Sequence, residues 1–131
     1  MIYNNLNIFC CKSKIGKSKE GKMATIDDFE KIDIRVGTII DARENEKARK
    51  PAYQLKIDFG PEIGIKASSA QITQCYQPKD LIDMQIIAVV NFPPRKVADV
   101  VSEVLVLGTD SEQGIVLLNP NEKVKNGDIV C

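Results

Sequence analysis

The stretch IDIRVG at residues 32–37 decides the fold of this chain. Apolar side chains occupy every second position and alternate with Asp33 and Arg35, which is typical of a strand with one buried face. Gly37 follows at a place where a β-bulge would let such a strand coil. The pattern predicts a first strand over residues 32–42.

Further strand signals follow toward the C-terminus. Strict alternation predicts strands over 53–59 and 63–67, joined by a turn at 60–62, and a continuous apolar run predicts a fully buried strand over 84–91. A fifth strand is expected over 102–107, after a proline-bearing loop over 92–100. Extra strand-like residues lie near 115–118.

Helical segments are few. Thr25 stands three positions before Asp28, which indicates a capped helical turn ahead of the first strand. A short helix is expected over 69–74 and a second turn over 79–82, between the third and fourth strands. Together these elements predict an all-β protein, a Greek-key barrel of the OB type with five principal strands, a short helix between strands three and four, and additional C-terminal strands.

Residues 1–22 differ from the rest of the chain. They hold five lysines and one glutamate and show no clear periodicity, so we expect a disordered leader or a mis-assigned start, with the binding domain over 23–131. The whole chain has no net charge, and residues 23–131 contain 13 basic and 17 acidic side chains. A domain of that balance is a weak candidate for nonspecific binding of nucleic acid, which needs many cations.

The residue types in the sequence give little support for catalysis or for metal binding. The chain contains no histidine, its four cysteines form no Cys-x-x-Cys pair, and no glycine-rich phosphate loop is present. We therefore expect a binding protein that is not an enzyme and needs no metal or cofactor. No apolar run approaches the roughly 18 residues that span a bilayer, and the unpaired cysteines favour a reducing compartment such as the cytoplasm.

Two predicted loops contain most of the candidate binding residues. An OB barrel generally binds ligands on the face of strands two and three, between the loops that join strands one to two and four to five. Those loops contain six cations and three acids, which makes a local positive rim that either attracts anionic ligands or is simply solvated. The cations are Arg43, Lys47, Arg49, Lys50, Arg95 and Lys96, and the acids are Glu44, Glu46 and Asp99.

The segment Asn91–Lys96 is the sharpest local feature. Pro93 and Pro94 fix the backbone and remove two donors, so the segment is stiff and cannot continue a ladder. Phe92 beside Arg95 and Lys96 suits base stacking or the docking of an apolar peptide side chain, and it equally suits a structural turn with the ring in the core.

Several of these motifs resemble the tRNA-binding-domain superfamily. Residues 29–37 are similar to its opening segment, and residues 68–73, 91–96 and 102–108 look like its CsaA branch, a group of bacterial chaperones linked to protein export. The resemblance runs from about Thr25 to the C-terminus. It implies an OB-fold homodimer that binds unfolded or precursor polypeptides, with the export ATPase as a further expected partner and tRNA as the alternative ligand.

The resemblance also assigns roles to particular positions. Lys96 and Ser102 are retained from the tRNA-binding relatives, whereas Pro93 and the pair Ala98-Asp99 replace cations that those relatives use, which favours polypeptide over tRNA. Ser69 and Gln71 offer a hydroxyl and an amide that either cap a helix or hold a ligand. The residues expected to contact a ligand are Arg43, Arg49, Ser69, Gln71, Asn91, Phe92, Pro94, Arg95, Lys96 and Ser102.

Overall fold

The computed structural model describes residues 23–47, 49–97 and 100–131, which form two compact units that divide after Lys31. The predicted leader over 1–22 lies outside the described residues. In the first unit, α1 (Ile26–Glu30) begins at Thr25. The Thr25 hydroxyl accepts from Asp28 N at 3.2 Å and Asp28 Oδ2 accepts from Thr25 N at 2.9 Å, which confirms the predicted capping of this turn.

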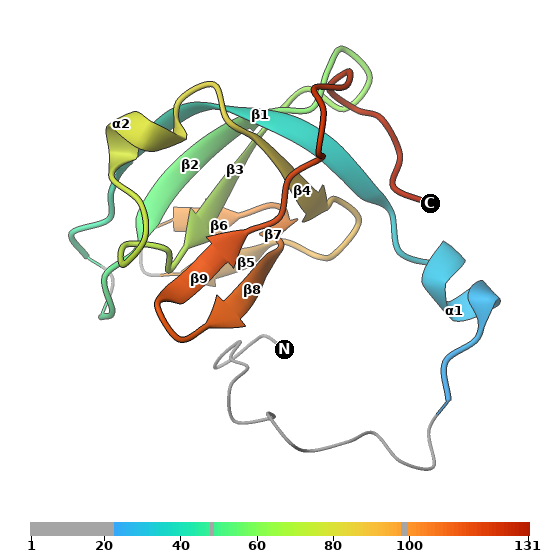
Figure 1. Cartoon of the computed structure of the whole chain (residues 1–131), viewed down its shortest axis with the longest axis horizontal. Coiled ribbons are helices and arrows are strands. Elements are labelled where there is room, and N and C mark those ends of the chain that lie inside the picture. The colour runs from blue at the N-terminus through green and yellow to red at the C-terminus, as the bar shows by residue number, and fades with distance from the viewer. Residues whose placement is uncertain (1–22, 48, 98–99) are drawn as a thin grey trace. The chain divides into compact units, whose positions relative to one another are not determined.

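The second unit is built from strands around one long central strand (Figure 1). Its principal sheet has the antiparallel order β3-β2-β1-β4-β7, so β1 pairs with β2 on one side and β4 on the other. Two small two-stranded sheets, β5-β6 and β8-β9, complete the unit. The strands are β1 (Ile34–Glu44), β2 (Tyr53–Asp58), β3 (Ile65–Ala70), β4 (Gln85–Val89), β5 (Arg95–Val97), β6 (Val100–Ser102), β7 (Leu105–Val106), β8 (Gly108–Ser111) and β9 (Gly114–Leu117).

The segment between β6 and β7 nearly closes the sheet into a barrel. Glu103 N donates to Ala67 O at 2.8 Å, and Ala67 N donates to the Glu103 carboxylate at 2.9 Å. A few residues later, β7 pairs with β4. The expected fifth strand therefore exists as two short pieces, one against β3 and one against β4, and the predicted all-β OB-fold class is confirmed.

The core lies inside this barrel. Alternate residues of β1 and β2 are buried, together with Phe59 just after β2 and Leu81 of α2 (Pro78–Leu81). Gly37 has a different role from the predicted bulge, because a Cβ atom there would lie 2.7 Å from Ile57 and 2.8 Å from the Phe59 ring. The glycine lets these side chains pack against the backbone of β1, and the irregularity in register comes later, between Ile39 and Asp41.

Three expectations about local structure were wrong. Residues 69–74 do not form a helix, because Ser69 and Ala70 pair with β2 as part of β3, and the helix between the third and fourth principal strands is α2. Arg43 is not in a loop, since β1 continues to Glu44. The predicted loop over 92–100 contains β5, which pairs with β6.

The C-terminal segment is held against the first half of β1. Val36 N donates to Asp128 O at 3.0 Å and Val130 N donates to Ile34 O at 2.9 Å, where β2 no longer reaches. The half-buried Arg35 guanidinium donates to Gly127 O at 2.9 Å and to Asp33, and the bond to Asp33 raises the pKa of Arg35. In the part of the chain that the structure describes, no helix is long and apolar enough to cross a membrane.

Candidate functional site

The outward face of β1, β2 and β3 presents a regular polar array. Strand register places Arg43 opposite Gln54, and Gln54 opposite Ser69, so these side chains form one row across three strands. A second row, two residues farther along each strand, consists of Asp41, Lys56 and Ala67. The register shift after Ile39 places Asp41 and Arg43, rather than their neighbours, on the face of Gln54 and Lys56.

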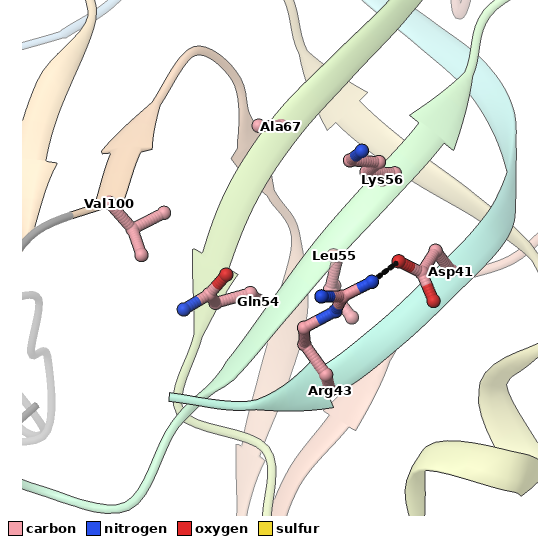
Figure 2. Close-up of a pocket in the computed structure, with 7 residues that line it drawn as sticks. All are labelled: Asp41, Arg43, Gln54, Leu55, Lys56, Ala67 and Val100. Atoms are coloured by element: carbon pink, nitrogen blue, oxygen red, sulfur yellow. Dashed lines mark hydrogen bonds and ion pairs between the residues drawn. The ribbon is translucent and has the colours of Figure 1, made fainter. Parts of the chain in front are cut away.

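A pocket of about 230 Å³ lies over these two rows (Figure 2). In Figure 2, Val100 of β6 stands across β3 from the charged side chains of β1. Arg43 Nη2 lies 2.7 Å from Asp41 Oδ2, and this hydrogen bond lowers the pKa of the Asp41 carboxyl below its ordinary value of 3.8. The pocket is lined by Asp41, Arg43, Gln54, Leu55, Lys56, Ala67 and Val100.

A second pocket, of about 340 Å³, adjoins the first at the β1–β2 loop. Gln54 and Val100 line both pockets, so the two pockets lie next to each other, and together they are called the groove. The second pocket is lined by Glu44, Asn45, Glu46, Lys47, Gln54 and Val100. Its charged residues are two carboxylates and one amine, whereas the first pocket has two cations and one carboxylate, so the charge reverses along the groove.

Ser102 connects this face to the β5-β6 hairpin. Its hydroxyl accepts from Ser69 N at 3.3 Å and donates toward Val104 O at 3.1 Å, while the buried Ser68 hydroxyl donates to the same carbonyl at 3.0 Å. Ser102 also pairs in register with Arg95. Strand register and this hydrogen bond therefore connect a line of residues across β1, β2, β3, β6 and β5, which includes Arg43, Ser69, Ser102 and Arg95. Within this line, the Ser102 hydroxyl is already hydrogen-bonded to protein atoms.

The residues before β5 divide between structural and exposed positions. Asn91 Oδ1 accepts from Asp33 N at 2.9 Å, which fixes the end of β4 to the start of β1. Phe92 does not enter the core and is 40% exposed, and Pro94 is exposed ahead of β5. Arg95 and Lys96 are exposed on β5, and Val101, opposite Lys96, is 48% exposed.

Two predicted residues lie apart from these rows. Arg49 is exposed in the β1–β2 loop, and Gln71 is exposed just beyond the end of β3. Ser69 does not cap a helix, because it belongs to β3 and no helix begins there. Sequence reasoning missed Gln54 and Lys56, which the alternation along β2 could have indicated, and it missed Asn45 and Val100, for which no local pattern gives a signal.

The arrangement suits binding more than bond-breaking chemistry. Among the described residues, no group of three or more histidine, cysteine or carboxylate side chains is placed to hold a metal ion. The groove offers hydrogen-bonding amides and paired charges. Such a surface can hold an extended chain with polar main-chain atoms and mixed side chains.

Comparison with known proteins shows which family model and which relatives this chain matches. Residues 34–129 match the family model described as a putative tRNA binding domain. The methionine–tRNA ligase of Pyrococcus abyssi is 34% identical over 116 residues, which are 87% of this chain and 16% of that enzyme. The chain thus spans about a sixth of the length of the curated relatives it matches.

Two solved structures are more similar. The CsaA chaperone of Bacillus anthracis is 52% identical, with a TM-score of 0.79, and the match covers 84% of this chain and all of that one. The CsaA chaperone of Picrophilus torridus is also 52% identical, with a TM-score of 0.80, and the match covers 83% of this chain and 100% of the other.

Proposed function

Because this chain belongs to the tRNA-binding domain family, and within it to the group of CsaA chaperones, we propose that it is a non-catalytic chaperone module that binds unfolded or precursor polypeptides. The observation that carries the proposal is the groove over β1, β2 and β3, in which each pocket is lined by both positive and negative side chains. Binding of precursors for export, together with an export ATPase, follows from the similarity to CsaA chaperones. The proposed compartment is the cytoplasm, in keeping with the free thiols of Cys75 and Cys131.

Electrostatics favours polypeptide as the main ligand. Arg43, one of the two cations that line the first pocket, is hydrogen-bonded to Asp41, and the adjoining pocket is lined by Glu44 and Glu46. Affinity for nucleic acid grows with the number of phosphates that protein cations neutralise, so a cation already paired with a carboxylate contributes little. A polypeptide needs main-chain hydrogen bonds and apolar contacts instead.

Exposed apolar side chains next to the hairpin β5-β6 support the same ligand. Phe92 and Val101 are both about half exposed, and Arg95 and Lys96 lie between them in sequence. An apolar side chain of an unfolded client can pack on Phe92 and Val101 while a carboxylate or chain terminus meets Arg95 or Lys96. Arg43, Arg49, Ser69 and Gln71 are proposed to contact the client along the barrel face, and Asn91, Pro94 and Ser102 to hold the hairpin in place.

Binding of tRNA is the second candidate function. The family match and the methionine–tRNA ligase relatives favour it, and the exposed cations of the β1–β2 loop and β5 give it a surface. Arg49, Lys50, Arg95 and Lys96 are the residues that would meet phosphates. This candidate would require phosphate to approach a groove that also contains Asp41, Glu44 and Glu46.

The proposal includes a homodimer and a binding domain over residues 23–131. Apolar side chains that are more than a third exposed occur on and after β9 and in the C-terminal segment, and a second copy would cover them: Val116, Leu118, Val124 and Ile129. Sedimentation equilibrium measures the dimer directly. A 14.5 kDa species at micromolar concentration would contradict this part of the proposal.

Chaperone activity is tested by light scattering of chemically denatured citrate synthase diluted into buffer. The full chain at a twofold excess is expected to reduce the scattering, because exposed client segments occupy the groove. Unchanged scattering at a tenfold excess of chain would contradict chaperone activity.

A further inference from the structure

The side chain of Asn45 is the clearest unexplained polar group in the described part of the chain. It is 5% exposed, and its Nδ2 atom, which has almost no exposed surface, has no hydrogen-bond partner. Buried amide groups nearly always have partners, because losing water without gaining another acceptor is unfavourable. An orphaned donor of this kind needs an explanation.

The other polar atoms of Asn45 are in use, and they fix its orientation. Asn45 N donates to Ala52 O at 2.9 Å, which closes the base of the β1–β2 loop. Asn45 Oδ1 accepts from Lys47 N at 3.2 Å. Because only an oxygen can accept from that N–H, the amide cannot be flipped without losing the bond, and the two Nδ2 protons remain for an external acceptor.

Asn45 lines the larger of the two pockets in the groove. The neighbouring side chains Glu44 and Glu46 are exposed at the pocket rim, so they can move aside for an acceptor at little cost. Gln54 continues the line of amides into the first pocket. The residue that carries the orphaned donor therefore lines the same groove in which the proposed function places the client.

The charge of the pocket indicates the kind of acceptor. Two carboxylates and one amine line it, so a phosphate oxygen would meet net repulsion. A neutral carbonyl oxygen would not. We propose, on the basis of the proposed function, that Asn45 is a specificity-determining residue whose Nδ2 donates to a main-chain carbonyl oxygen of the bound polypeptide.

The test uses the full chain and two substitutions. Asn45→Asp keeps an oxygen that can accept from Lys47 N but removes the Nδ2 protons, and Asn45→Ala removes both groups. Asn119→Asp is the matched control, because it adds the same negative charge at an exposed position outside both pockets. The probes are reduced, carboxyamidomethylated α-lactalbumin, which stays unfolded, and bulk tRNA, with binding measured by fluorescence anisotropy and stability by thermal unfolding.

Loss of one hydrogen bond to the client predicts an affinity for α-lactalbumin lower by about three- to tenfold in Asn45→Asp and Asn45→Ala. The control binds as wild type does, and the tRNA affinity of both variants does not change. Asn45→Asp places a carboxylate at a 5% exposed position between Glu44 and Glu46, so its midpoint of unfolding should fall, and binding is compared at a temperature at which every variant is folded. Wild-type affinity in both variants, or a loss of tRNA binding instead, would overturn the inference. An affinity for α-lactalbumin that falls in Asn45→Asp but not in Asn45→Ala would assign the effect to the buried charge, and the inference would be overturned. If the wild-type chain itself does not bind α-lactalbumin, the proposed function fails. If only the inference about Asn45 is wrong, wild-type binding is still observed, so the two failures are distinguishable.

Discussion

The main-chain N–H of Ser69 donates to the hydroxyl of Ser102 at 3.3 Å, and this bond joins the barrel face to the β5-β6 hairpin. Ser102 also pairs in register with Arg95. The hairpin with the exposed Arg95 and Lys96 is thereby held at a defined position next to the groove, which its Val100 lines. A preorganised surface of this kind loses less conformational entropy when a ligand binds.

Removing the Ser102 hydroxyl tests this connection. Ser102→Ala leaves Ser69 N without its acceptor in a partly buried place, so we expect the free energy of unfolding to fall by about 1–2 kcal/mol. Ser69→Ala is the matched control, because the main-chain donor survives, and it should change stability by less than about 0.5 kcal/mol. Urea denaturation followed by circular dichroism measures both variants. Equal stability of Ser102→Ala and wild type would contradict the role of this bond.

The ion pair on β1 makes a prediction about pH. Arg43 lowers the pKa of Asp41, so the pair contributes stability above the ordinary carboxyl pKa and loses it only as pH falls through the lower pKa of the folded chain. NMR titration of the Asp41 carboxyl carbon should give a midpoint below 3.8. Arg43→Gln should move that midpoint upward, toward the ordinary value. An unchanged midpoint in Arg43→Gln would show that another group causes the shift.

The same pair predicts how the groove responds to nucleic acid. Asp41→Asn releases Arg43 from its carboxylate, so the affinity for bulk tRNA at low salt should rise, with a steeper dependence on salt. A gain of about one charge in the salt slope is expected. Glu112→Gln, which removes a charge from the exposed β8–β9 turn, serves as the control and should leave the slope unchanged. Identical slopes for Asp41→Asn and wild type would mean that tRNA does not approach Arg43.

Gly37 makes a prediction about packing. A Cβ atom at this position would lie within 2.8 Å of Ile57 and Phe59, so Gly37→Ala should destabilise the fold by about 1–3 kcal/mol. Phe59→Leu shortens one of the two clashing side chains. The double variant should therefore lose less stability than the sum of the two single variants, as measured by urea denaturation. Strict additivity would contradict the close approach.

A substitution at Phe92 should affect the binding of a polypeptide without affecting the stability of the fold. Because its ring is 40% exposed and not part of the core cluster, Phe92→Ala should keep the thermal midpoint near that of wild type. Its affinity for an unfolded polypeptide should fall by about three- to tenfold, since an apolar contact surface is lost. Ile82→Ala, a truncation just after α2 at a side chain that is also 40% exposed and lines neither pocket, provides the control for surface exposure in general. A large drop in the midpoint of Phe92→Ala would place the ring in a structural role.

The hydrophobic pattern predicts the barrel well and its irregular parts poorly. Alternation identifies β1 and β2 because each buries one row of side chains in a single core. A continuous apolar run identifies β4, although Gln85 and Ile87 are only partly buried. The segment Ser68–Gln71 misleads, since its small polar residues suit a helix start. The Ser68 hydroxyl is in fact satisfied inside the barrel by Val104 O, a partner 36 residues away that no local pattern reveals.

The site residues also divide into some that the sequence could predict and others that it could not. The cations of the two loop regions could be found by composition alone, and Phe92 by its neighbours. The reach of β1 to Glu44 could not, because the shift in register after Ile39 changes which charged residues share a face with Gln54. Asn45 and Val100 meet in one pocket only through tertiary structure, so charge counting along the chain gives no indication of either.

Salt-dependent titration of the full chain tests the central claim most directly. The chain is titrated with bulk tRNA and, separately, with unfolded α-lactalbumin, from low to physiological ionic strength. A polypeptide chaperone with a charge-paired groove should keep its affinity for α-lactalbumin at physiological salt and lose most of its affinity for tRNA. Tight tRNA binding with a steep salt slope, and no binding of α-lactalbumin, would contradict the account and establish tRNA as the ligand.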